Sequence, residues 1–288
     1  MKSRGFFIVA ILGLFLALFS GCQEVNNDQP GRIVVKITDA PFPIDLIEEA
    51  NVTITKVEIR NEDESEEGEE SEESEESSFI TIFEGSEEFN LIELRNGVMA
   101  ELIDMEIPAG NYNLIRIYVE NASIAVKDYE TYSVKVPSGS QTGIKMFVKP
   151  SLKVAGGLTA EVLLDFNLDK SFVLQGNMKT PAGIKGFNFK PVIRAVNITT
   201  AGTVQGIVTD TVDIPLVDVA VSVTQEEVVT TAYTDEEGFY AMPGLPAGMY
   251  TMSAEKEGYN SVTIEEVKIV EGNKTVQDIE MEPVTPEE

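Results

Sequence analysis

The sequence predicts an all-β protein made of two β-sandwich domains. Apolar and polar residues alternate in many segments, as at Ile33, Val35 and Ile37, and a period of two gives a strand one buried face. These short segments are separated by turns rich in Gly, Pro and Asn, a spacing typical of sandwiches and barrels. Only residues 43–49 and 97–103 suggest a helical turn, so we expect little helix.

The first domain is expected at residues 32–200. Between Ile54 and Val57 the apolar parity slips by one residue. A β-bulge near Thr55 and Lys56 would return both side chains to the core, because a bulge adds one residue to its strand. The alternation predicts strands at residues 32–38, 51–60, 79–83, 89–94, 113–126, 132–136, 144–154, 158–165 and 186–198.

An acidic tract at residues 61–78 lies between two of these strands. Residues 62–76 carry 11 acidic side chains and no basic one. The tract has no apolar residue with which to offset the entropy of ordering, so we expect a disordered surface loop inside the first domain. Calcium needs its oxygen ligands held in a defined loop, and the Glu/Ser run lacks that spacing. A solvated, repulsive spacer is therefore preferred to a calcium site.

The second domain is expected at residues 203–283, followed by a short tail at 284–288. Val219, Val221 and Val223 share one parity, as the buried face of a strand requires. We expect about seven strands in this domain. The main segments are strands at 204–208, 219–223, 250–254, 261–270 and 275–281 and turns at 235–238 and 243–248.

One sequence pattern occurs in both domains. Residues 107–112 read Ile-Pro-Ala-Gly-Asn-Tyr, and residues 245–250 read Leu-Pro-Ala-Gly-Met-Tyr. Pro fixes φ for a turn, and Gly allows the positive φ that other residues avoid. We interpret the pattern as a shared corner in two related sandwiches, with Tyr112 and Tyr250 packed at the sandwich end. Coincidence in a turn-rich sequence is the alternative.

The N-terminus has the features of a secretory signal at residues 1–21. Two cations in Met1–Arg4 precede an apolar stretch at residues 5–19, which is shorter than the ~20 residues that a membrane-spanning helix needs. Ser20 and Gly21 then lead to Cys22, which is the only cysteine of the chain.

This arrangement resembles the lipobox of bacterial lipoproteins, although Phe19 stands where that family prefers Leu. The resemblance implies cleavage between Gly21 and Cys22, acylation of the Cys22 thiol (palmitate among the acyl groups) and a lipidated tether at residues 22–31. Gln23 after the cysteine implies the outer membrane of a Gram-negative bacterium, facing the periplasm or the cell surface. An ordinary secretory peptide with an incidental cysteine is the alternative.

The composition excludes most enzymatic chemistry. The chain has no histidine and no tryptophan, so it can build neither a Ser-His or Cys-His nucleophile nor a His/Cys zinc site. We therefore predict no catalytic residue, no cofactor and no metal. A carboxylate pair or a Ser-Lys dyad stays open, but no spacing singles one out. The net charge of −28 argues against nucleic acid and against electrostatic docking on anionic lipid.

Several acidic residues could bind a ligand. Asp39 follows the first strand, and we prefer a turn in which its carboxylate accepts backbone N–H groups. Asp165, Asn167 and Asp169 alternate after a strand, and a strand-end turn is preferred to a cation site. Asp210-Thr211-Val212 fits a short O-glycosylation pattern, which is a weak signal because of its length.

Three tyrosines could bind sugar rings. Tyr129, Tyr132 and Tyr259 lie in or beside predicted turns, where an exposed aromatic ring could stack on a glycan. The chain has no tryptophan, and Tyr259 sits in a Gly-Tyr pair that also suits a structural role. Packing is therefore the preferred reading for these rings.

Two family resemblances cover most of the chain. The segments at 206–210, 215–221, 234–240, 245–250 and 257–259 resemble a carboxypeptidase regulatory-like domain, a sandwich of the prealbumin/Cna-B type. Some Cna-B domains carry a Lys-Asn isopeptide link from the first strand, but residues 203–210 contain no lysine. Residues 31–198 resemble the lipoprotein family of domain of unknown function 4382, on the segments at 34–41, 108–117, 164–166 and 191–194. That family implies architecture and no activity.

We expect a non-catalytic, lipid-anchored envelope protein that serves as a binding, adhesion or scaffolding module. A carbohydrate-binding accessory to a polysaccharide-uptake system is the first alternative, and a hydrolase that uses carboxylates alone is the second. The sequence leaves open the ligand, the partner and the oligomeric state.

Overall fold

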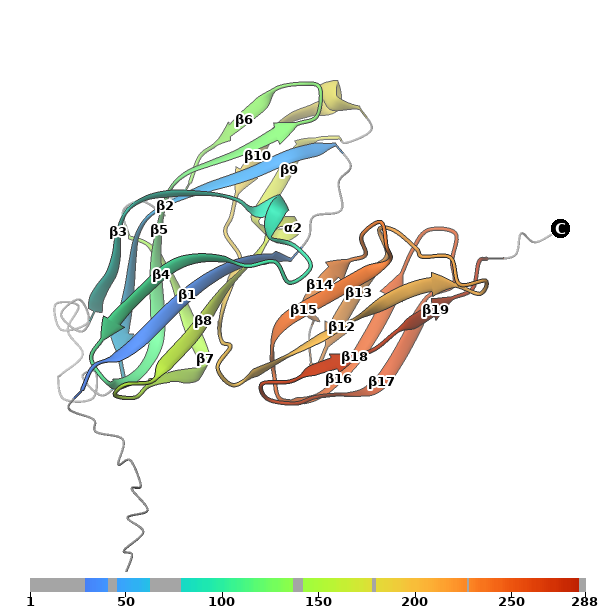
Figure 1. Ribbon diagram of the computed structural model, residues 1–288. Helices are drawn as coiled ribbons and strands as arrows, with labels where there is room; N and C mark the ends of the chain where they lie inside the picture. The colour runs from blue at the N-terminus through green and yellow to red at the C-terminus, as the bar shows by residue number, and fades with distance from the viewer. Residues whose placement is uncertain are drawn as a thin grey trace, which may run out of the picture.

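The computed structural model describes residues 29–40, 46–62, 79–136, 142–177, 180–226 and 228–284 of the 288-residue chain. The described residues are nearly all strand, and they form two units with separate hydrophobic cores, so the predicted all-β fold is confirmed. Figure 1 shows the units side by side. Residues 1–28, 63–78 and 285–288 lie outside the description, and with them the predicted signal, most of the tether and acidic tract, and most of the tail.

The first unit has eleven strands and three short helical segments. Its strands are Gly31–Ala40 (β1), Ile47–Asn61 (β2), Phe79–Asn90 (β3), Ala100–Ile107 (β4), Gly110–Val126 (β5), Thr131–Val134 (β6), Ile144–Val154 (β7), Thr159–Asn167 (β8), Phe172–Gly176 (β9), Ile184–Phe189 (β10) and Ile193–Asn197 (β11). The helical segments are Leu91–Leu94 (η1), Leu168–Ser171 (α2) and Pro181–Gly183 (η2). In the described part of the chain, no helix could cross a membrane.

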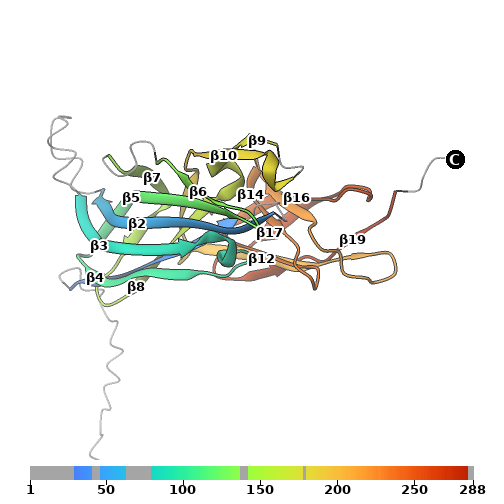
Figure 2. The ribbon, with the colours of Figure 1, turned by 90° about the horizontal axis from the view of Figure 1, so that it is seen from above.

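The strands of the first unit form two layers. The β1 layer has the order β4-β1-β8-β11, and the β5 layer has the order β3-β2-β5-β7, with β6 also paired to β5. The layers join into one nine-stranded sheet because β7 and β11 pair at one position, Val148 with Ala195. Figure 2 shows the two layers apart, with β2 and β5 in the upper part of the picture and β4 and β8 below them. Ile33, Val35 and Ile37 are fully buried between the layers, as their alternation predicts.

The predicted β-bulge is confirmed. The register of β2 against both β3 and β5 shifts between Ile54 and Lys56. Ile54 and Val57 are both fully buried in the first core, although they differ in parity. The extra residue thus keeps the apolar side chains of β2 directed into the core on both sides of the bulge.

Four predicted elements differ from the structure, one of them only at residues 47–49. Residues 97–103 do not form a helical turn, because β4 pairs with β1 and buries Ile103 and Ile107 in the core. Residues 91–94 form η1 and not a strand, since the side chain of Asn90 accepts the N–H of Ile92. The predicted strand at 186–198 is divided near Pro191 into β10, which pairs with β9, and β11, which pairs with β8. Residues 47–49 begin β2, and 41–45 lie outside the description.

The second unit is a smaller sandwich. One layer has the order β15-β12-β18, with β19 also on β12, and the other has the order β14-β13-β16-β17. Because β18 and β19 follow one another along the same strand, they fill the place of a single strand, and the count agrees with the predicted seven. The bounds are Ala201–Asp210 (β12), Ala220–Thr224 (β13), Val228–Tyr233 (β14), Phe239–Pro246 (β15), Gly248–Glu255 (β16), Val262–Ile269 (β17), Lys274–Val276 (β18) and Ile279–Met281 (β19).

Both units have the same strand order. In each unit the first strand has an antiparallel neighbour on one side (β4 or β15) and a parallel neighbour on the other (β8 or β18). The opposite layers also correspond, as β3-β2-β5-β7 and β14-β13-β16-β17. The first unit is therefore the same sandwich with β6, β9, β10, β11 and α2 added.

The repeated sequence pattern occupies the same corner in each unit. Tyr112 and Tyr250 are buried, and each hydroxyl donates to the carbonyl four residues earlier, at 2.9 Å to Pro108 and 2.8 Å to Pro246. A tyrosine corner of this kind fixes the path of the chain from one layer to the other. The predicted shared corner is confirmed, but its glycines do not adopt the positive φ that we expected.

Removing either corner hydroxyl should destabilise the protein. We expect Tyr112→Phe and Tyr250→Phe each to lower the free energy of unfolding by about 1 kcal/mol, because each buried tyrosine loses its hydrogen bond to a proline carbonyl. Urea unfolding of the full chain measures this change. Tyr129→Phe is the matched control, since Tyr129 is 51% exposed. An equal loss in the control, or none at the corners, would contradict the assigned role.

Candidate functional site

The predicted lipidation and cleavage residues, Cys22 and Gly21, lie outside the described residues, so both remain predictions. The other candidate residues fall in two places. One is the seam where the β1 layer of the first unit meets the second unit. The other is the outer face of the β5 layer.

Asp39 lies behind the seam, and its pKa is raised more strongly than that of Asp165 in the seam itself. It is 4% exposed and lies on the core side of β1, in line with Ile37. Its Oδ1 accepts the N–H of Leu168 at 3.2 Å, and Oδ2 has no partner among the described residues. The expected local turn is therefore wrong: Asp39 does accept a backbone N–H, but from the distant start of α2. Burial raises the pKa of Asp39 well above its usual range, and the nearby charge of Asp165 raises it further.

Asp165 links the two units through one arginine. It pairs with Thr38 across β1 and β8, so it lies on the opposite face of the layer from Asp39. Arg194 donates to its Oδ2 from Nε at 3.2 Å and from Nη2 at 2.6 Å. The Nη1 of Arg194 donates to the carbonyl of Gly244 in the second unit at 3.0 Å. Burial raises the pKa of Asp165, although the guanidinium opposes the shift.

Apolar contacts surround this polar bridge. Val34, Leu163, Val196 and Ala241 are buried, yet they belong to neither domain core. A Cβ built on Gly244 would lie 3.2 Å from Leu163 Cδ2 and 3.7 Å from Val196 Cβ, which shows how closely the units approach. The seam therefore holds the two sandwiches against each other through packing as well as through Arg194.

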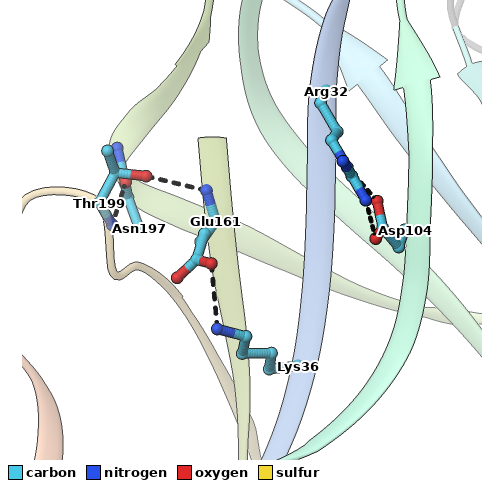
Figure 3. A network of polar contacts seen from close by, with 6 residues as sticks. All are labelled: Arg32, Lys36, Asp104, Glu161, Asn197 and Thr199. Atoms are coloured by element: carbon cyan, nitrogen blue, oxygen red, sulfur yellow. Dashed lines mark hydrogen bonds and ion pairs between the residues drawn. The ribbon is translucent and has the colours of Figure 1, made fainter. Parts of the chain in front are cut away.

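The rest of the outer β1 face is a set of matched polar contacts (Figure 3). Arg32 pairs with Asp104 on β4, and Lys36 pairs with Glu161 on β8 at 3.0 Å. The backbone N–H of Glu161 donates to the Thr199 hydroxyl at 2.8 Å, at the turn that leads into the second unit. Each charge here has a partner on the next strand.

Asp165, Asn167 and Asp210 have structural roles. Asn167 caps α2 by accepting the N–H of Lys170 at 2.9 Å, so the preferred strand-end turn is confirmed and Asp165 faces Arg194. The carboxylate of Asp210 accepts the N–H groups of Val212 and Ile214. Among the described residues, no group of three or more His, Cys, Asp or Glu side chains could hold a metal ion.

A second polar cluster lies on the outer face of the β5 layer. Glu58 is 6% exposed and accepts hydrogen bonds from Arg116 Nε at 2.6 Å and from the Tyr118 hydroxyl at 3.0 Å, and it also pairs with Lys56. Burial alone would raise the pKa of Glu58, but these three donors together lower it. The Arg116 guanidinium carbon lies 4.0 Å from the centre of the Phe79 ring.

The aromatic candidates divide differently from the prediction. Tyr132 donates to the carbonyl of Ile184 at 2.9 Å, and Tyr259 packs against the second core, so both are structural. Tyr129 is exposed. Sequence reasoning missed Phe147, which is 61% exposed on β7. Its signal was present, because Phe147 has the parity opposite to the buried residues of that strand.

The buried Asp39 should make stability depend on pH. The folded-state pKa of Asp39 lies above the unfolded value of about 3.9. The free energy of unfolding therefore falls as pH rises from the unfolded pKa to the folded pKa. We expect Asp39→Asn to raise the melting temperature at pH 8 relative to wild type, with the gain vanishing at about pH 4. Asp104→Asn is the control, because Arg32 lowers the pKa of Asp104 and its removal should give no gain. Equal behaviour of the two variants in thermal scans would refute this account.

Several solved structures are similar to the chain. The minor pilin GBS52 of Streptococcus agalactiae is 12% identical and covers 88% of this chain and 98% of its own, with a TM-score of 0.25. A shaft pilin SpaA of Lactobacillus rhamnosus GG is 10% identical. Its match covers 90% of this chain and 100% of the pilin, with a TM-score of 0.25. The 3-chlorocatechol 1,2-dioxygenase of Rhodococcus opacus 1CP is 16% identical. Its match covers 28% of this chain and 59% of the dioxygenase, with a TM-score of 0.23. Our chain thus spans less than two thirds of the dioxygenase, and scores this low carry no argument about function.

The sequence models of two families match in the order that the residues suggested. No curated protein matches the chain. Residues 203–282 match the carboxypeptidase regulatory-like domain, which corresponds to the second unit. Residues 30–191, more than half of the chain, match the domain of unknown function (DUF4382). The chain therefore belongs to the DUF4382 family and carries a carboxypeptidase regulatory-like domain after it.

Proposed function

We propose that this protein is a non-catalytic module of the bacterial envelope, anchored by acyl groups on Cys22 and serving to bind or scaffold a partner. The observation that carries the proposal is the position of the lone cysteine directly after a short apolar signal. The tether runs from Cys22 to the start of β1 at Gly31, so it spans about 30 Å at full extension. The sandwiches would then stand close to their membrane, on its periplasmic or outer face.

The state of the buried carboxyl groups supports a non-catalytic role. Asp39 and Asp165 are buried carboxyl groups on neighbouring strands, but they lie on opposite faces of the β1 layer. Asp165 is held by Arg194, and Asp39 by the backbone of Leu168. A hydrolase needs two carboxyl groups that face one bound substrate. This pair instead fixes α2 and the second unit, which disfavours the carboxylate-only hydrolase.

A rigid two-sandwich body suits binding. The seam joins the units through a side-chain bridge and buried apolar residues, so surfaces on both units keep a fixed relation. Rigid elements present a binding surface at lower entropic cost than mobile ones. A carbohydrate-binding accessory protein remains the second candidate, and the exposed ring of Phe147 favours it.

Replacing the sulfur of Cys22 should release the protein from its membrane. We expect Cys22→Ser, expressed as the full chain in a Gram-negative host, to move from the membrane pellet to the soluble fraction or to accumulate as an uncleaved precursor. Fractionation and intact mass measure both outcomes. Ser20→Ala keeps a small residue beside the cleavage point and should behave as wild type. A Cys22→Ser protein that loses the signal and still stays in the membrane pellet would overturn the proposal.

A further inference from the structure

We propose that the outer face of the β5 layer binds an acidic polysaccharide, with Phe147 stacked on a sugar ring and nearby cations on its carboxylates. The inference rests on the proposed function as an envelope binding module and names the chemistry of its partner. We call this surface the β5 platform, and it consists of Arg60, Leu114, Phe147, Lys149 and Lys153.

The centre of the platform is a row of three apolar side chains and one arginine, with one exposed ring at its end. Strand register places Phe79, Arg60, Leu114 and Phe147 side by side across β3, β2, β5 and β7. Leu114 is 2% exposed although it belongs to neither core, so its neighbours on the outer face cover it. Phe147 at the end of this row is 61% exposed. An aromatic ring of this kind offers its face to the C–H groups of a sugar.

Basic side chains extend the platform along β7. Lys149 and Lys153 are exposed, and they alternate with buried Val148 and Leu152, so they share the outer face with Phe147. Within the described ranges, neither lysine forms a salt bridge. The cations of the outer β1 face, in contrast, are paired. Unpaired lysines beside an exposed ring leave positive charge available to an anionic partner.

Side-chain contacts fix the position of the residues around the platform. Arg116 lies against the Phe79 ring and bonds to Glu58 at 2.6 Å. Arg60, between Phe79 and Leu114 in the same row, donates from Nη2 to Asn113 Oδ1 at 3.3 Å. These contacts hold the row in place before any ligand arrives, which reduces the entropy lost on binding.

The position of the platform favours a polysaccharide over a polypeptide. A peptide partner commonly adds a strand to a free sheet edge. The platform lies on a sheet face and not on a sheet edge, and its strand β7 pairs with β5 along both ends and with β11 at Val148 alone. The net charge of −28 would repel a polyanion at long range, but at ~0.15 M salt this repulsion is screened beyond about 8 Å. Local charge then decides whether an acidic chain binds: the platform's cations attract it, and Glu62, two residues after Arg60, opposes them.

Alginate, a polymer of uronic acids, is the probe, and neutral dextran is the reference. Binding to the detergent-solubilised full chain is measured at about 0.15 M salt. We expect Phe147→Ala and the double variant Lys149→Glu/Lys153→Glu each to weaken alginate binding at least about tenfold, while dextran is not retained. The matched control is Lys268→Glu/Lys274→Glu, an equal charge change at exposed positions of the second unit, which should leave affinity unchanged.

Each other result would overturn the inference. These results are no alginate binding by wild type, equal retention of dextran, an equal loss in the control, or binding of poly-glutamate as tight as that of alginate. Urea unfolding of the same samples identifies any variant that has lost its fold. The Cys22→Ser fractionation tests the proposed function separately. If alginate fails while Cys22→Ser still releases the protein, the partner class is wrong and the anchored module stands.

Discussion

The structure depends on the corner at which each unit passes from one layer to the other. With no cysteine beyond Cys22, no internal disulfide can hold the layers together, so packing and hydrogen bonds must do so. At this corner the tyrosine hydroxyl satisfies a proline carbonyl, and the first strand passes very close to the opposite layer. A Cβ on Gly31 would lie 2.5 Å from the carbonyl of Ala155, and one on Gly202 would lie 2.5 Å from that of Val270. Both positions accept only glycine without a backbone shift.

The same corner explains how much of the fold the sequence could predict. The Pro-Ala-Gly-x-Tyr repeat and the parity slip after Ile54 are local signals, and the structure confirms both. Residues 97–103 were misjudged because their strand pairing with β1 involves residues far away in the chain. The hairpin β9–β10 was missed for the same reason, since Tyr132 and Phe187 pack it against β6. Alternation shows which face is apolar but not which strand lies alongside.

The candidate sites, too, were predictable in their local features and not in their distant contacts. The sequence predicted Asp39 in a turn after the first strand, but it lies on β1, and the distant N–H that it accepts belongs to α2, which the sequence did not predict. The parity of Phe147 was readable from the sequence. Its exposure was not, because parity assigns a face and does not say whether another element covers that face. Arg32 and Lys36 of β1 face acidic side chains on the neighbouring strands, whereas Lys149 and Lys153 of β7 form no ion pair among the described residues. The sequence alone does not distinguish these two cases.

The acidity of the chain is therefore not a property of every surface. Residues 203–288 hold 18 acidic side chains against three lysines, and the tract at 62–76 adds 11 more. The β5 layer instead carries Arg60, Arg116, Lys149 and Lys153 on one outer face, with Glu58 buried among its donors. Screening at ~0.15 M salt limits each charge to about 8 Å. A partner on this face therefore meets its cations together with the start of the tract, because Glu62 follows Arg60 by two residues. A strongly acidic protein can thus keep one face suited to an acidic ligand, while its remaining surface repels the same ligand and prevents binding elsewhere.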